Sequence, residues 1–141
     1  IIIMTSNLGS EYILENNKDS NKLIMEELRH TFKPEFINRI DEIIIFNPLN
    51  KDVLYSILDN IIHNIEKRLD NMHISINLTD KAKKYVIDNS FDEKYGARPM
   101  KRFVSKNIES LLANNIIEDN IKFGENIVID IDNDKFVIKN G

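Results

Sequence analysis

One arginine of this chain, Arg98, lies at a predicted helix start, where a phosphate group could bind. Arg98 directly precedes a proline, a residue common in the first turn of a helix, and it follows Gly96 and Ala97, which leave room for a ligand. A helix N-terminus has unpaired N–H groups and partial positive charge, and it binds phosphate readily. The planar guanidinium also matches phosphate oxygens. The alternative is a surface arginine paired with Asp92 or Glu93.

A second arginine could act on a phosphate bound elsewhere. Arg39 follows a short helix expected over residues 34–38 and precedes the apolar run 42–46, which predicts a core strand. Such rigid neighbours would hold the side chain while it projects outward. An arginine supplied by a neighbouring subunit can raise phosphoryl-transfer rates by about 10³–10⁵. The alternative is an ion pair with Asp41 or Glu42.

A third polar residue follows an apolar run. Residues 1–4 predict a buried strand, and Asn7 comes soon after it. Nucleotide sites gather at the carboxyl ends of strands, where an asparagine amide can orient water or contact a γ-phosphate. The alternative is an Asx turn. Because the run begins abruptly and without Met, we expect the chain to be cut from a larger domain.

Three segments together resemble the C-terminal part of a Clp/ClpB-type AAA+ protein disaggregase, in its second AAA+ module. They are Thr5-Ser6-Asn7, the stretch FKPEFINRID over residues 32–41, and YGARPMKR over residues 95–102. The resemblance extends from Ile2 to the C-terminal end. Each motif is moderately specific, and their shared order makes them jointly strong.

The resemblance assigns roles to individual residues. It implies that Asn7 is sensor 1, that Arg39 is an arginine finger acting in trans, and that Arg98 is sensor 2. Gly96 and Ala97 would lie beside the nucleotide. Ile57, on a predicted lid helix, would contact adenine.

The resemblance also implies a function. The full-length protein would be an ATP-dependent chaperone that remodels or disaggregates proteins by threading them. It would use ATP or ADP with Mg²⁺, form a homo-hexameric ring, and act on unfolded or aggregated proteins with co-chaperones. We expect no nucleotide bound tightly to this chain alone. Its sequence has no G-x-x-x-x-G-K-[ST] loop and no strand ending in an acidic pair, so it should not hydrolyse ATP by itself.

Other functions remain open at this point. A protease-coupled Clp ATPase would carry an Ile/Leu-Gly-Phe/Leu tripeptide between sensor 1 and the finger, and the interval from Leu8 to Thr31 has none. A non-catalytic helical interaction module would explain the missing phosphate loop, but not three motifs in family order. A AAA+ protein that acts on DNA is disfavoured, because the chain carries a net negative charge.

Composition narrows the class further. The 141 residues carry a formal net charge of −4, which argues against a nucleic-acid partner. There is no cysteine, hence no disulfide or zinc–thiolate site. No apolar run approaches the roughly 18 residues of a membrane span, so we expect a soluble intracellular protein whose compartment stays open. The alternating Asp130, Asp132 and Asp134 lack a calcium-loop pattern, and we expect no metal ligands.

The element pattern predicts an α+β fold. Helices are expected from Lys22, over 51–71, after Thr79 and from Pro99, with strands over 74–78, 127–131 and 136–138. Residues 49–141 would form a small lid domain of three helices and a sheet ending in a hairpin. Residues 1–48 would be the C-terminal fragment of an α/β nucleotide-binding domain. The segment 47–50 would be the hinge between them.

Overall fold

The computed structural model describes residues 1–15, 19–92 and 95–140. Its contacts divide the chain into two compact units, Ile1–Pro48 and Leu49–Gly141. Each unit is described by itself. The mixture of helices with a small sheet confirms the α+β class.

Among its described residues, the first unit has helices as its regular structure. It contains α1 (Ser10–Leu14), α2 (Ser20–Thr31) and α3 (Pro34–Ile37). α2 turns Ile24 inward, where it is 6% exposed, against the backbone of Gly9. Gly9 has a φ of 70°, and an added Cβ would lie 2.8 Å from Cγ1 of Ile24. The turn before α1 therefore requires glycine for both its backbone conformation and its close approach.

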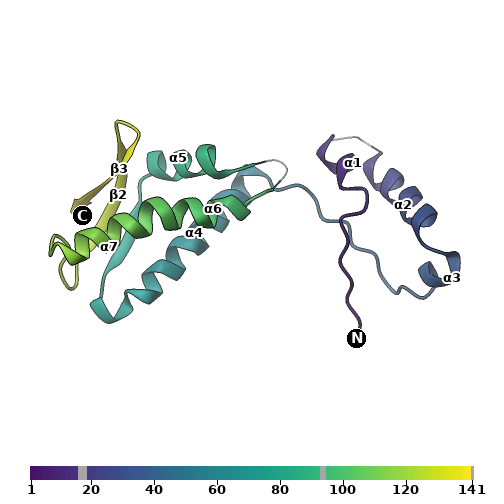
Figure 1. Cartoon of the computed structure of the whole chain (residues 1–141), viewed down its shortest axis with the longest axis horizontal. Coiled ribbons are helices and arrows are strands. Elements are labelled where there is room, and N and C mark those ends of the chain that lie inside the picture. The colour runs from purple at the N-terminus through teal and green to yellow at the C-terminus, as the bar shows by residue number, and fades with distance from the viewer. Residues whose placement is uncertain (16–18, 93–94, 141) are drawn as a thin grey trace. The chain divides into compact units, whose positions relative to one another are not determined.

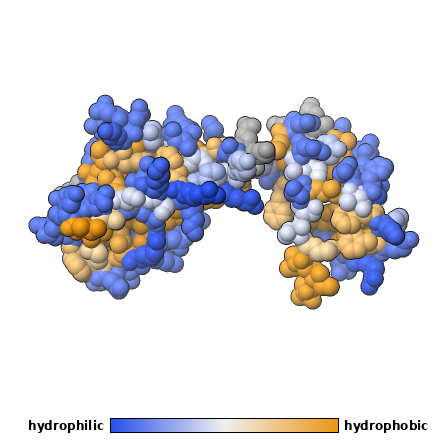
Figure 2. Space-filling view, in the orientation of Figure 1, coloured by the Kyte–Doolittle hydropathy of each residue, from blue (hydrophilic) through white to orange (hydrophobic). Residues whose placement is uncertain are grey.

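Two strands predicted in this unit are wrong. Residues 1–4 and 42–46 form no strand, and Ile2, Ile44 and Phe46 are 90%, 66% and 81% exposed. A strand needs a neighbour for its N–H and C=O groups and a surface for its side chains. No strand lies among the described residues of the first unit, so these apolar runs have nothing to pair with. Figure 2 shows the apolar N-terminal end at the surface.

The second unit begins with two capped helices. α4 (Lys51–Arg68) starts where the N–H of Val53 donates to Oδ1 of Asn50 at 2.9 Å. A 3₁₀ turn, η1 (Asp70–Met72), follows it. α5 (Asp80–Ser90) starts where the N–H of Ala82 donates to Oγ1 of Thr79 at 3.1 Å. Both helices start where the sequence predicted, because a cap depends only on its own first turn.

A long helical run follows in three parts. α6 (Arg98–Val104) continues through a π-helical segment, η2 (Ser105–Glu109), into α7 (Ser110–Ile117). The joining residues keep right-handed helical angles, so the chain does not turn between them. In Figure 1 this run lies beside α4, and contacts join α6 to both α4 and α5.

The helices cover one face of a sheet. Within the described residues the sheet has three strands, β1 (Ser75–Leu78), β2 (Asn126–Asp132) and β3 (Lys135–Asn140), in the order β1-β2-β3. β1 pairs with β2 in parallel, and β3 returns antiparallel to β2. The predicted hairpin turn is confirmed, since Asn133 and Asp134 have φ values of 46° and 60°.

A single apolar core joins this sheet to the helices. It includes the inward residues of β2 and the buried stripe of the α6–α7 run, where Met100, Val104 and Ile108 are each 0% exposed. On α4 the buried residues are Leu54, Leu58, Ile62 and Ile65. Ile57 and Ile61 are half-buried at the edge of this buried stripe. This core holds the starts of α4 and α6 in place.

Candidate functional site

The Gly96–Arg98 corner is shaped by backbone bonds before α6. Gly96 has a φ of 64°, in the left-handed region. Its N–H donates to the carbonyl of Asp92 at 2.6 Å, and the N–H of Tyr95 donates to Oδ1 of Asp92 at 2.9 Å. The N–H of Met100 then donates to the carbonyl of Ala97 at 3.1 Å and opens the helix. These bonds hold Tyr95 and Gly96 against Asp92, and the chain then leads directly into α6.

The guanidinium of Arg98 has no partner among the described residues. Arg98 is the first residue of α6 and is exposed. Across residues 1–15, 19–92 and 95–140, its side chain forms no hydrogen bond or ion pair, and Asp92 is therefore not its partner. Glu93, the other alternative, lies outside the described residues. An exposed arginine anchored at a helix start can bind an anion at little conformational cost to the surrounding fold.

The start of α4 lies beside the same corner. An ideal Cβ on Gly96 would stand 3.7 Å from Cδ1 of Leu49, which is ordinary van der Waals contact. Ala97 and Ile57 are both partly buried and pack against the core. Ile57 is the seventh residue of α4, about 9 Å along the helix from Lys51. The start of α4 therefore lies beside the corner formed by Gly96, Ala97 and Arg98. Ile57 lies further along α4.

Asn7 and Arg39 both lie in the first unit. Asn7 is exposed and accepts the N–H of Ser10 at 3.2 Å through its backbone carbonyl. Arg39 is exposed directly after α3, and its N–H donates to the carbonyl of Phe36 at 3.1 Å. In the part of the chain that the structure describes, neither side chain forms a hydrogen bond or ion pair, so Arg39 is not paired with Asp41 or Glu42.

A polar network on η2 was not predicted from the sequence. The carboxylate of Glu109 accepts the Ser105 hydroxyl and one guanidinium nitrogen of Arg68 at the end of α4. The Ser105 hydrogen bond, followed by that from Arg68, lowers the pKa of Glu109 below its ordinary value of 4.5. Arg68 and Glu109 are 41 residues apart, and only the tertiary fold brings them together. The network ties α4 to the helical run that starts at Arg98.

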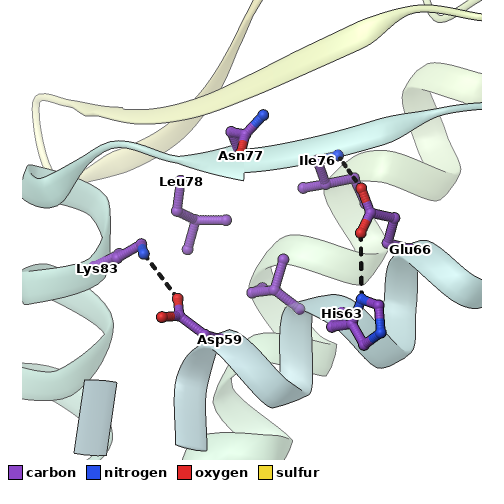
Figure 3. A pocket seen from close by; sticks show the side chains of 8 residues that line it. Asp59, His63, Glu66, Ile76, Asn77, Leu78 and Lys83 are labelled. Atoms are coloured by element: carbon purple, nitrogen blue, oxygen red, sulfur yellow. Dashed lines mark hydrogen bonds and ion pairs between the residues drawn. The ribbon is translucent and has the colours of Figure 1, made fainter. Parts of the chain in front are cut away.

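A small hollow of about 140 Å³ lies between α4 and β1. Figure 3 shows Glu66 between His63 and the backbone of β1. Its carboxylate accepts the N–H of Ile76 at 3.1 Å and lies 3.5 Å from Nδ1 of His63. Nearby, Nζ of Lys83 lies 2.7 Å from Oδ1 of Asp59. The polar groups around the hollow are thus paired with one another. Glu66 accepts a hydrogen bond from an N–H on the edge strand β1, where unpaired backbone groups promote aggregation.

The fold of the second unit and the matches to family models together define the class of protein. Helices over a three-stranded sheet form the second unit, and residues 1–43 of the chain match the model of the AAA domain (Cdc48 subfamily). The chain thus falls among the AAA proteins. Residues 49–129 match the model of the C-terminal, D2-small domain of ClpB protein, and the chain belongs to that family.

Relatives support this assignment along the whole chain. The chain is 41% identical to the chaperone protein ClpB of Bacillus cereus over 145 residues, which cover 98% of this chain and 17% of the relative. It is 40% identical to the negative regulator of genetic competence ClpC/MecB of Bacillus subtilis, covering 99% of this chain and 19% of that protein. A solved Hsp104-ADP complex of S. cerevisiae matches with a TM-score of 0.81 and 34% identity, covering 92% of this chain and 24% of that one.

The chain therefore spans about a sixth of the length of the ClpB relatives that it matches. Among the described residues, no helix is both long and apolar enough to cross a bilayer.

Proposed function

We propose that this chain is the C-terminal part of an ATP-dependent chaperone of the ClpB type. In this proposal residues 1–48 end the large AAA+ domain and residues 49–141 form its lid. The full-length protein assembles into a hexameric ring and threads unfolded or aggregated proteins through it. The family match and the relatives named chaperone protein ClpB support this function.

The nucleotide would lie against the corner at the start of α6. Arg98 is assigned as sensor 2, with Gly96 and Ala97 beside the phosphates and Ile57 near adenine. The observation that carries this assignment is the exposed Arg98 guanidinium, which no described residue neutralises. The similarity to a solved Hsp104 chain described as an ADP complex adds support for ATP or ADP, with Mg²⁺, as the cofactor.

The first unit would contribute to catalysis from two positions. Asn7 is assigned as sensor 1, which orients water at the γ-phosphate of its own subunit. Arg39 is assigned as the arginine finger that reaches the nucleotide of the neighbouring subunit. Its exposure directly after α3 and its lack of an ion pair among the described residues suit that role.

The test uses substitutions in the full-length protein. Arg39→Ala should lower ATP turnover by about 10³-fold or more while leaving nucleotide binding measurable. Arg98→Ala should weaken nucleotide affinity or uncouple it from hydrolysis. Arg29→Ala and Lys101→Ala, exposed cations on α2 and α6, are the matched controls and should change neither quantity. Normal turnover with Arg39→Ala would exclude the finger role.

A protease-coupled Clp ATPase is the second candidate, because the ClpC/MecB relative is nearly as similar as the ClpB relatives. The missing tripeptide between Leu8 and Thr31 favours the ClpB type. Co-purification of the full-length protein with a barrel-shaped protease would reverse this preference.

A further inference from the structure

Asp92 bonds to the segment before α6 through both its backbone and its side chain. Its Oδ1 accepts the N–H of Tyr95 at 2.9 Å, and its carbonyl accepts the N–H of Gly96 at 2.6 Å. In return, the N–H of Asp92 donates to the carbonyl of Gly96 at 3.4 Å, and the two residues form an isolated antiparallel bridge. One residue thus supplies two acceptors and one donor to the segment that leads to Arg98.

The bond from Tyr95 is the part of this arrangement that depends on the side chain at position 92. Most residues there would offer the same backbone donor and acceptor for the bridge. A short side chain with an oxygen is needed to reach a nearby backbone N–H, as Asp and Asn do in turns. The Asp92 carboxylate therefore holds Tyr95 directly before Gly96, whose φ of 64° sets the direction of the chain.

Asp92 itself follows an anchored part of the fold. The N–H of Phe91 donates to the carbonyl of Ile87 at 3.0 Å, and Phe91 packs half-buried against the core. On the far side of the corner, Met100 is 0% exposed, and its N–H donates to the carbonyl of Ala97. The corner thus lies between two fixed points, and Asp92 joins the first of them to it.

Arg98 depends on this corner for its placement. Its side chain is exposed and forms no hydrogen bond or ion pair with the described residues, so the backbone before it decides where the guanidinium starts. Asp92 is also exposed, and its side chain therefore fills no space in the core. Replacing Asp92 leaves no cavity, which makes the corner accessible to a clean test.

We propose that Asp92 is a positioning residue of the nucleotide site and that it acts through Arg98. Its side-chain bond to Tyr95 restricts the segment before α6 to the conformation that presents the guanidinium to a phosphate. This inference rests on the proposed role of Arg98 as sensor 2. A group that is already held where its ligand needs it loses less conformational freedom on binding. A hydrogen bond of ordinary strength corresponds to about a two- to tenfold change in an equilibrium constant.

The test measures ADP affinity and ATP turnover in variants of the full-length protein. Asp92→Ala and Asp92→Asn remove the same charge, but only Asp92→Asn keeps an acceptor for Tyr95. Asp92→Ala should therefore change the same quantity as Arg98→Ala, in the same direction, by about two- to tenfold relative to Asp92→Asn. Asp88→Ala is the matched control, because it removes an exposed carboxylate from α5, and it should change neither quantity.

A double variant shows whether Asp92 acts through Arg98. In an Arg98→Ala background the corner has no guanidinium to present, so adding Asp92→Ala should have little further effect. Such non-additivity is the mark of two residues that work as one unit. An equal loss from Asp92→Ala in both backgrounds would overturn the proposal, because Asp92 would then act independently of Arg98.

The positioning can also be measured without a nucleotide, in the 141-residue chain. Asp92→Ala should speed hydrogen exchange at the amides of Tyr95 and Gly96, whereas Asp92→Asn should leave these amides protected. The same exchange in both variants would mean that the side-chain bond does not hold the corner, and it would overturn the positioning role.

The outcomes separate this inference from the proposed function. Normal ADP affinity and normal turnover in Arg98→Ala would contradict the sensor role, and the positioning role would fail with it. An effect of Arg98→Ala together with identical behaviour of Asp92→Ala and Asp92→Asn would overturn the positioning role alone.

Discussion

Gly96→Ala tests the backbone geometry that presents Arg98. The φ of 64° at this position is readily adopted by glycine but strained for alanine. An L-residue in the left-handed region costs about 1–2 kcal/mol. The added methyl contributes no clash, since its nearest neighbour would be Cδ1 of Leu49 at 3.7 Å. We therefore expect the free energy of unfolding to fall by about 1–2 kcal/mol.

The assay is urea unfolding of the 141-residue chain followed by far-UV circular dichroism. Gly124→Ala is the matched control, because Gly124 has a φ of 78° and an added Cβ would meet nothing within 4 Å. It should lose a similar amount of stability. Gly96→Asn should lose less, because asparagine tolerates the left-handed region better.

Two outcomes would contradict the left-handed conformation of Gly96 as the cause. Full stability in Gly96→Ala would mean that the turn before α6 is not left-handed. A loss far larger than that of Gly124→Ala would mean that Leu49 crowds Gly96 and that packing, rather than backbone strain, requires the glycine.

Two further predictions concern carboxylates that the fold uses. Glu109 has a lowered pKa, so its contribution to stability is present above the ordinary value of 4.5 and is lost as the pH falls below it. Glu109→Gln should lower the free energy of unfolding at neutral pH by about 0.5–1 kcal/mol, a value kept small because Arg68 is exposed. It should also reduce the fall of the urea-unfolding midpoint as the pH is lowered into the acid range. An unchanged fall of the midpoint would contradict the network. Glu66→Ala should cost about 1 kcal/mol and speed hydrogen exchange at the Ile76 amide, whereas Glu66→Gln retains an acceptor and should protect it. Equal exchange rates in both variants would show that Glu66 does not cap the edge strand.

Local rules in the sequence account for much of the second unit. Asn50 and Thr79 cap their helices at the predicted starts, because an N-cap needs only a side-chain oxygen and a free N–H three residues later. The hairpin turn at Asn133 and Asp134 is equally local. The corner at Arg98 was predictable for the same reason, since Gly96 and the following proline specify a turn and then a helix.

Features that depend on distant partners were beyond such rules. The apolar runs at 1–4 and 42–46 have strong strand propensity, but strand formation needs a neighbouring strand. Glu66 meets Ile76, and Arg68 meets Glu109, only because α4 packs beside β1 and η2. The burial of Ser90 at the end of α5 was equally beyond local rules, because it depends on how α5 meets α6.

The most direct test of the proposed function is an experimental structure of the full-length protein with a slowly hydrolysed ATP analogue. We expect the Arg39 guanidinium to lie within about 2.7–3.2 Å of the γ-phosphate held by the neighbouring subunit. Arg98 should contact a phosphate of the nucleotide in its own subunit. A structure in which Arg39 pairs with Asp41 or Glu42 and Arg98 faces solvent beside a bound nucleotide would contradict it.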